Sequence, residues 1–119
     1  GVGECGACTI IVDGKAVTTC LMLAAQLDGR AVETVEGLGT PEALHPVQDA
    51  FVDRHGVQCG FCTPGLLMST KALFEENPSP SRADIATAIA GNLCRCTGYH
   101  QIFASIEAAA ARSSSKDRP

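Results

Sequence analysis

Seven cysteines carry most of the chemistry that this sequence could perform, and they fall into two groups along the chain. The groups are Cys5, Cys8 and Cys20, then Cys59, Cys62, Cys94 and Cys96. Closely spaced pairs can direct their sulfurs at one point, which is typical of metal sites. A disulfide between Cys59 and Cys62 would close a very small loop and stabilise little, and a redox Cys-x-x-Cys motif is a further alternative.

The second group offers four thiolates, a donor set that suits either zinc or an iron–sulfur cluster. Zinc sites built from four cysteines are common, so the donor set alone leaves zinc open. The Cys94-x-Cys96 spacing, however, differs from the paired Cys-x2-Cys knuckles of zinc ribbons. This spacing favours an iron–sulfur cluster.

The first group fits part of the plant-type ferredoxin pattern, in which Cys-x4-Cys-x2-Cys is followed by a distant cysteine. Cys5 and Cys8 match its second and third ligands, and Cys20 matches the fourth. The first ligand is then expected immediately before Gly1. The loop glycines up to Gly6 allow tight turns and bring N–H groups close to the sulfurs.

The elements that must position these cysteines change in character along the chain. Apolar, β-branched residues at 9–12 and 16–19 flank Asp13-Gly14, which predicts a hairpin, and residues 31–38 alternate like another strand. Residues 21–27 fit a helix or a strand. The Gly- and Pro-bearing stretch at 37–42 predicts a domain boundary.

Helical signals follow this boundary, including proline near the helix starts and a capping box at Ser81. The four predicted helices span 45–56, 63–77, 82–93 and 99–113. Together they predict a compact bundle. In an antiparallel bundle the first and third connections lie at the same end, so the four thiols of the second group are expected to converge there.

Composition excludes several other classes of protein. The net charge of −4, with scattered Lys and Arg, argues against a nucleic-acid partner. Apolar stretches are too short for a membrane span, and no secretory leader precedes Cys5. Thiol-rich metal sites need a reducing compartment for assembly, so we expect the protein in the cytoplasm.

Three longer motifs surround the cysteines and are more specific than the spacing alone. They are Cys5-Gly-Ala-Cys8-Thr, Gln58-Cys59-Gly-Phe-Cys62-Thr-Pro-Gly and Gly91-Asn-Leu-Cys94-Arg-Cys96-Thr-Gly-Tyr99. In these motifs the chain resembles the iron–sulfur subunit of the xanthine oxidase family of molybdenum hydroxylases. The detail looks most like the small subunits of bacterial three-subunit members, such as carbon monoxide dehydrogenase and 4-hydroxybenzoyl-CoA reductase.

The resemblance implies an α+β fold. A partial β-grasp, plant-type ferredoxin-like domain at 1–38 is expected before a four-helix [2Fe-2S]-binding bundle at 42–112, with a frayed tail at 113–119. It also implies that the family's first β-hairpin, the helix after it and the first cysteine ligand lie outside this N-terminally truncated sequence.

The resemblance further implies two [2Fe-2S] clusters with separate ligand sets. The proximal cluster, nearer molybdenum, would take Cys59, Cys62, Cys94 and Cys96, and the distal cluster, nearer the flavin, would take Cys5, Cys8 and Cys20. Gln58 and Cys96 would lie near the pterin.

The implied function is electron relay, with no catalytic residue on this chain. Electrons would pass between molybdopterin on a large subunit and FAD on a medium subunit, in a heterotrimer or its dimer. Substrate chemistry would occur at molybdenum on the large subunit. A stand-alone [2Fe-2S] carrier and a zinc-stabilised interaction module are the competing hypotheses.

Overall fold

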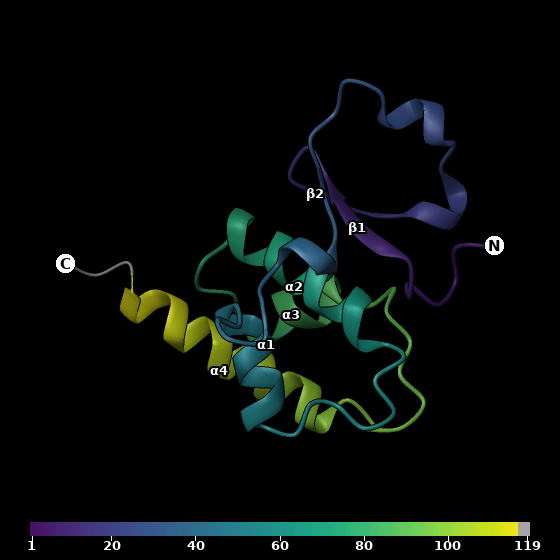
Figure 1. The fold of residues 1–119 in the computed structure, drawn as a ribbon. Coiled ribbons are helices and arrows are strands. Elements are labelled where there is room, and N and C mark those ends of the chain that lie inside the picture. The colour runs from purple at the N-terminus through teal and green to yellow at the C-terminus, as the bar shows by residue number, and fades with distance from the viewer. Residues whose placement is uncertain (117–119) are drawn as a thin grey trace.

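The computed structural model describes residues 1–116 and confirms the α+β class, with a small sheet beside four helices (Figure 1). The strands are β1 (Thr9–Val12), β2 (Lys15–Thr18) and β3 (Val32–Glu33), in the antiparallel order β2-β1-β3. The helices are α1 (Pro46–Asp53), α2 (Thr63–Glu76), α3 (Arg82–Ala88) and α4 (His100–Lys116).

The predicted hairpin forms where the sequence places it. Asp13 and Gly14 both adopt positive φ, at 50° and 81°, which is the primed-turn geometry that an Asp-Gly pair favours. The strand predicted over 31–38 is shorter than expected, because only Val32–Glu33 pairs with β1. The chain then turns through a 3-10 segment at Val35–Gly37.

Residues 21–27, which fitted a helix or a strand by pattern, form neither. They contain a 3-10 turn at Ala24–Leu27, just after another such turn at Thr19–Leu21. Cys20 therefore lies within a short turn that follows β2 directly.

The third and fourth helices differ from their predicted bounds. α3 ends at Ala88 rather than near residue 93, since the N–H of Ala90 donates to the Thr87 carbonyl oxygen only three residues back, and the N–H of Leu93 then donates to the Cys5 carbonyl oxygen. α4 continues to Lys116, so the tail expected from residue 113 begins with another turn of helix. Residues 117–119 of that tail lie outside the described part.

α2 is the centre of the fold and is buried on opposite sides. Leu66 and Leu67 pack in the core between the helices, whereas Met68 and Ala72 pack with Ile11 of the sheet. A helix that is apolar around much of its circumference is expected to lie inside a protein. α2 therefore packs against the other helices on one side and against the sheet on the other.

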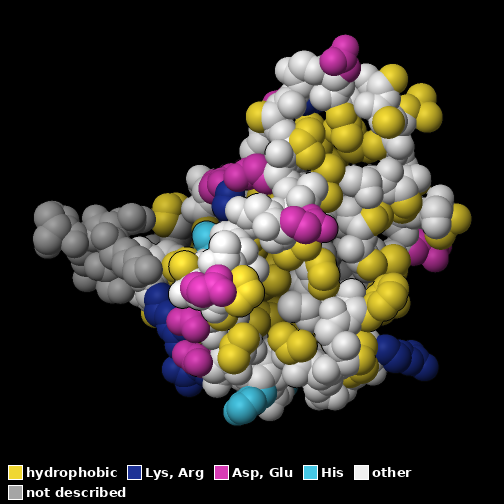
Figure 2. Space-filling model, viewed as in Figure 1, with side chains coloured by type: hydrophobic (Ala, Val, Ile, Leu, Met, Phe, Trp, Pro, Cys, Tyr) yellow, Lys and Arg dark blue, Asp and Glu magenta, His cyan; other side chains and the backbone are white. Residues whose placement is uncertain are grey.

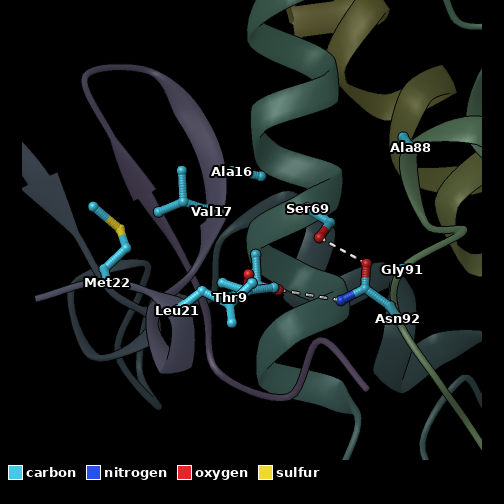
Figure 3. Close-up of a pocket in the computed structure, with 10 residues that line it drawn as sticks. Thr9, Ala16, Val17, Leu21, Met22, Ser69, Ala88, Gly91 and Asn92 are labelled. Carbon is cyan, nitrogen blue, oxygen red and sulfur yellow. Dashed lines mark hydrogen bonds between the residues drawn. The ribbon is translucent and has the colours of Figure 1, made fainter. Parts of the chain in front are cut away.

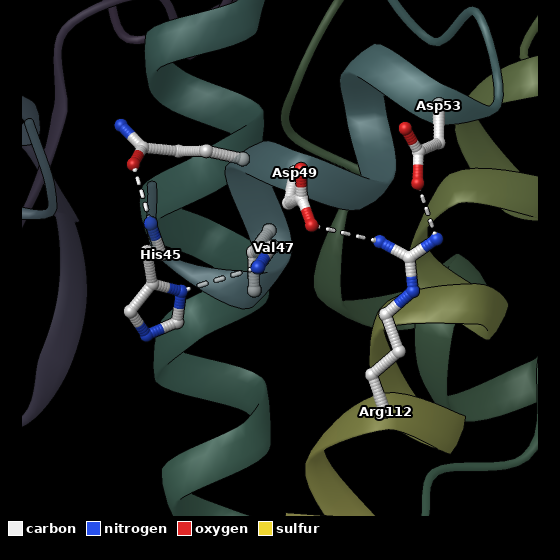
Figure 4. A network of polar contacts seen from close by, with 6 residues as sticks. His45, Val47, Asp49, Asp53 and Arg112 are labelled. Carbon is white, nitrogen blue, oxygen red and sulfur yellow. Dashed lines mark hydrogen bonds and ion pairs between the residues drawn. The ribbon is translucent and has the colours of Figure 1, made fainter. Parts of the chain in front are cut away.

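A polar network joins the first and last helices at the surface. Arg112 of α4 pairs with Asp49 at 3.4 Å and with Asp53 at 2.6 Å, both on α1 (Figure 4). At the start of α1, Nδ1 of His45 accepts a hydrogen bond from the N–H of Val47. These ion pairs are largely exposed, so we expect each to contribute less than about 1 kcal/mol.

On the face seen in Figure 2, side chains of both charge signs lie among exposed apolar ones. Within residues 1–116, none of the helices has the length and apolar character that crossing a bilayer requires.

Gly65 is where α2 meets the first cysteine loop. A Cβ built at Gly65 would overlap the carbonyl oxygen of Gly6, whereas a Cβ at Gly37 would meet nothing. We expect Gly65→Ala to lower the free energy of unfolding by roughly 1–3 kcal/mol through overpacking. This loss would come despite alanine's better helix propensity, which favours the variant by up to about 1 kcal/mol.

Chemical denaturation of the two single variants measures this difference. Gly37→Ala is the matched control and should stay within about 0.5 kcal/mol of the parent chain. Equal stability of the two variants would show that the contact at Gly65 is not tight.

Candidate metal centres

All seven cysteines lie in the described part of the chain, and all are free thiols. The second group occupies two connections, which join α1 to α2 and α3 to α4. Its members line one cavity together with Cys5, Phe61 and Leu93. The fold therefore brings the four thiols of the second group, from two distant stretches of sequence, to one place.

The strongest contacts among the four thiols pair Cys62 with Cys94 and Cys96 with Cys59. Burial raises the pKa of Cys62 to about 11, and the neighbouring Cys94 thiol adds to this shift. The pKa of Cys96 is raised chiefly by its contact with Cys59. Each pair consists of one cysteine from either connection, so both connections are needed for each half of the site.

Hydrogen bonds to sulfur already favour the thiolate at Cys94. Burial would raise the pKa of this thiol, but bonds with the Thr97 hydroxyl and the backbone N–H groups of Thr97 and Cys96 lower it to about 7. The Thr97 Oγ1 to Cys94 Sγ distance is 3.2 Å. The N–H of Phe61 likewise donates to Cys59 Sγ at 3.5 Å.

The Tyr99 side chain fixes the backbone around Cys94. Its hydroxyl accepts a hydrogen bond from the Cys94 N–H at 2.8 Å and donates one to the Asn92 carbonyl at 2.9 Å. Tyr99 itself has φ of 68°, an unusual conformation for a bulky side chain. The sequence motif includes Tyr99 but does not indicate these contacts of its hydroxyl.

The first group is arranged around Cys8. The backbone N–H of Cys20 donates to Cys8 Sγ at 3.3 Å, and this bond, assisted by the Thr19 side chain, lowers the pKa of Cys8 to about 7. Cys5 is exposed and borders the cavity of the second group instead. The structure thus joins Cys8 with Cys20 and puts Cys5 between the two groups.

A direct hydrogen bond links the two groups. The N–H of Leu93, the residue before Cys94, donates to the Cys5 carbonyl oxygen at 2.8 Å. No spacing in the sequence indicated this contact, because its partners lie in different motifs. It makes Cys5 the point at which the two cysteine groups meet.

Gln58 lies beside Cys59 in the α1–α2 connection and is exposed. Within the described residues no helix or strand covers it. The sequence motif nominated Gln58 through resemblance alone, and its exposure leaves the side chain accessible to a partner.

The arrangement of the thiols bears on which metal they could hold. Among the described residues, no three His, Cys, Asp or Glu side chains are grouped as a site for one ion. A [2Fe-2S] cluster takes four thiolates, two on each iron. Four cysteines that line one cavity, with an N–H directed at Cys59 Sγ and an O–H at Cys94 Sγ, fit such a cluster.

Fold and thiol arrangement together define an iron–sulfur protein. Comparison with known sequences identifies it further: residues 34–107 match the [2Fe-2S] binding domain family. The chain belongs to that family. This match confirms the resemblance that the cysteine motifs indicated.

Individual relatives support the same assignment. The chain is 56% identical over 104 residues to the nicotine 6-hydroxylase small subunit of Paenarthrobacter nicotinovorans, covering 87% of this chain and 62% of that protein. It is 47% identical over 110 residues to the nicotinate dehydrogenase small FeS subunit of Eubacterium barkeri, covering 92% of this chain and 70% of that protein. The chain therefore spans only part of the length of these relatives, about three fifths of the first.

A solved structure has the same fold. The aldehyde oxidoreductase from Desulfovibrio gigas superposes with a TM-score of 0.93 at 44% identity, covering 98% of this chain and 13% of that one. The likeness therefore includes both cysteine-bearing parts of this chain, within a much longer protein.

The Tyr99 hydroxyl provides a test of the loop that carries Cys94. Tyr99→Phe keeps the ring but leaves the Cys94 N–H and the Asn92 carbonyl without this partner. We expect a loss of about 1–3 kcal/mol in stability, and faster release of bound iron to a chelator. Chelator kinetics on the iron-loaded protein measure this effect, and an unchanged release rate would contradict the assigned role.

Proposed function

We propose that this chain is the electron-transfer iron–sulfur subunit of a molybdenum hydroxylase. It relays electrons between molybdopterin on a large subunit and FAD on a medium subunit. The observation that carries this proposal is the Leu93–Cys5 hydrogen bond, which joins the two thiol groups into one continuous path. The relatives named above, small subunits of a hydroxylase and a dehydrogenase, support the same role.

We assign the ligands by group. The proximal [2Fe-2S] cluster takes Cys59, Cys62, Cys94 and Cys96, and the distal one takes Cys5, Cys8 and Cys20. Each bound cluster supplies reversible one-electron chemistry. Hydrogen-bond donors contact the sulfurs of Cys8, Cys59 and Cys94 and would stabilise negative charge there. Such bonds tune the reduction potential of a bound cluster.

The sheet and the helices are proposed to form two units. Residues 1–38 correspond to part of a β-grasp, plant-type ferredoxin-like domain, and residues 42–112 to the helical [2Fe-2S]-binding domain. The antiparallel β2-β1-β3 sheet and the four helices support this division. Clusters held by exposed thiolates need a reducing compartment for assembly, for which we propose the cytoplasm.

The surface around the second thiol group supports a partner at that end. Phe61 and Leu93 flank the cavity and are 78% and 60% exposed, which is unusual for large apolar side chains beside a metal site. Cys96 and Gln58 are exposed at the same end. We propose that the large subunit covers this surface, with its pterin near Gln58 and Cys96.

Purification of the protein from its native cells tests the function. We expect co-purification with molybdenum- and FAD-containing subunits, and two distinct [2Fe-2S] EPR signals when the clusters are reduced during a potentiometric titration. A colourless protein that contains zinc would refute the proposal and favour an interaction module. Two clusters on a protein that purifies alone would instead favour a stand-alone carrier.

Substitution of Phe61 tests the proposed docking surface. Phe61→Asp introduces a charge into an apolar interface and should weaken association with the large subunit at least about tenfold. Leu44→Asp is the matched control, because Leu44 is 41% exposed just before α1, at the end of that helix opposite to the connection that carries Cys59 and Cys62. Titration of each variant against the partner subunit measures affinity, and equal affinities would place the interface elsewhere.

A further inference from the structure

Three backbone segments meet closely between the two cysteine groups. A Cβ on Gly6 would overlap the Gly91 carbonyl oxygen, and a Cβ on Gly65 would overlap the Gly6 carbonyl oxygen. The first cysteine loop is thus pressed against both α2 and the loop that follows α3. Contacts this tight transmit small displacements of one loop to the other.

Asn92 is the polar side chain that ties these three segments together. It is only 4% exposed, and its Nδ2 donates to the Gly6 carbonyl at 3.2 Å. Its Oδ1 accepts a hydrogen bond from Ser69 of α2 at 2.8 Å. Figure 3 shows the Asn92 amide between Ser69 and Thr9, whose Oγ1 lies 3.5 Å from Nδ2.

We call the bonds of Asn92 with Ser69 and with the Gly6 carbonyl the Asn92 clamp; its place in the chain ties it to the Leu93–Cys5 bond. Asn92 precedes Leu93, and Gly6 follows Cys5, so the Asn92–Gly6 bond runs beside the Leu93–Cys5 bond. The two bonds connect the same pair of loops, one through a side chain and one through the backbone. As long as the Asn92–Gly6 bond is formed, it fixes the geometry of the Leu93–Cys5 bond.

We propose that Asn92 is a positioning residue, held by Ser69, that sets the separation between the two cysteine groups and keeps the Leu93–Cys5 bond formed. This inference rests on the proposed function, since the separation matters for electron transfer between two clusters. Asn92 touches no thiol in the described contacts and acts through the backbone of Cys5 and Leu93.

Removal of the clamp should leave the first cysteine turn itself intact. The Gly6 carbonyl oxygen also accepts hydrogen bonds from the N–H and the Oγ1 of Thr9, at 3.2 and 2.7 Å. Loss of the Asn92 amide therefore does not leave that carbonyl without a partner. The expected defect is a looser junction between the loops rather than loss of either thiol group.

The test uses the intact protein with its accompanying subunits, carrying Asn92→Ala or the milder Ser69→Ala. Iron and labile sulfide per chain should match the parent protein. In the fully reduced protein, the EPR splitting that arises from magnetic coupling between the two clusters should be smaller or broadened in Asn92→Ala, and changed to a lesser degree in Ser69→Ala. Hydrogen exchange at the Leu93 amide should be roughly five- to tenfold faster in Asn92→Ala, as expected for loss of one hydrogen bond's net stabilisation.

Ser105→Ala is the matched control for Ser69→Ala. Ser105 is fully buried, but its hydroxyl donates to the Gln101 carbonyl within α4, away from the junction. It should change neither the EPR splitting nor the exchange of the Leu93 amide. If Ser105→Ala changed these two readouts as much as Ser69→Ala does, the effect would come from a general loss of core stability. That result would overturn the proposal.

Other outcomes distinguish failure of the positioning role of Asn92 from failure of the electron-transfer function on which it rests. Unchanged splitting and unchanged Leu93 exchange in Asn92→Ala would overturn the positioning role while leaving the electron-transfer function intact. A parent protein without two [2Fe-2S] signals would refute the function, and the exchange measurement would still decide whether Asn92 holds the junction. If Asn92→Ala fails to fold, Ser69→Ala against Ser105→Ala decides the question.

Discussion

The close packing of backbone at the Gly6 carbonyl is the constraint on which the rest of the structure depends. This one oxygen faces Gly65 of α2 and accepts hydrogen bonds from Thr9 and Asn92. Only glycine at positions 6 and 65 allows such an approach, because a Cβ at either position would overlap a carbonyl oxygen. The sheet, the central helix and the second cysteine loop are all positioned from this point.

The thiol sites depend on the helices but are not carried within them. Cys62 lies at the cap position of α2, and the loop of Cys94 and Cys96 precedes α4. The two connections can approach because α1 packs against α4 and α2 packs against α3. In a chain with so small a sheet, bound metal is expected to add to stability, since metal ligation couples to folding in small domains.

Much of this arrangement could be predicted from local sequence signals. The Asp13-Gly14 turn, the proline-marked starts of α1 and α2 and the Ser81 cap each depend on neighbouring residues, and all were located correctly. The approach of the four thiols followed from their places between helices. The errors lie where the chain leaves a regular element: β3 pairs over two residues and passes into the turn at Val35–Gly37, and α3 passes into the loop that bonds to the Cys5 carbonyl.

The features missed at the site are also tertiary. The Leu93–Cys5 bond, the Tyr99 hydroxyl contacts and the Asn92 clamp join residues whose relation is set by packing, not by spacing. A glycine-rich stretch predicts tight turns, but it does not reveal which other backbone fills the space that a side chain would have taken. Such contacts became visible only with the fold.

The central claim is that Cys59, Cys62, Cys94 and Cys96 hold one binuclear iron–sulfur cluster. X-ray absorption at the iron edge, on protein with Cys8 and Cys20 replaced by alanine, isolates this site and tests its ligation directly. We expect about two irons per chain, sulfur-only ligation and a clear iron–iron scattering signal. Zinc bound by the same four thiols, or iron without a neighbouring iron, would contradict it.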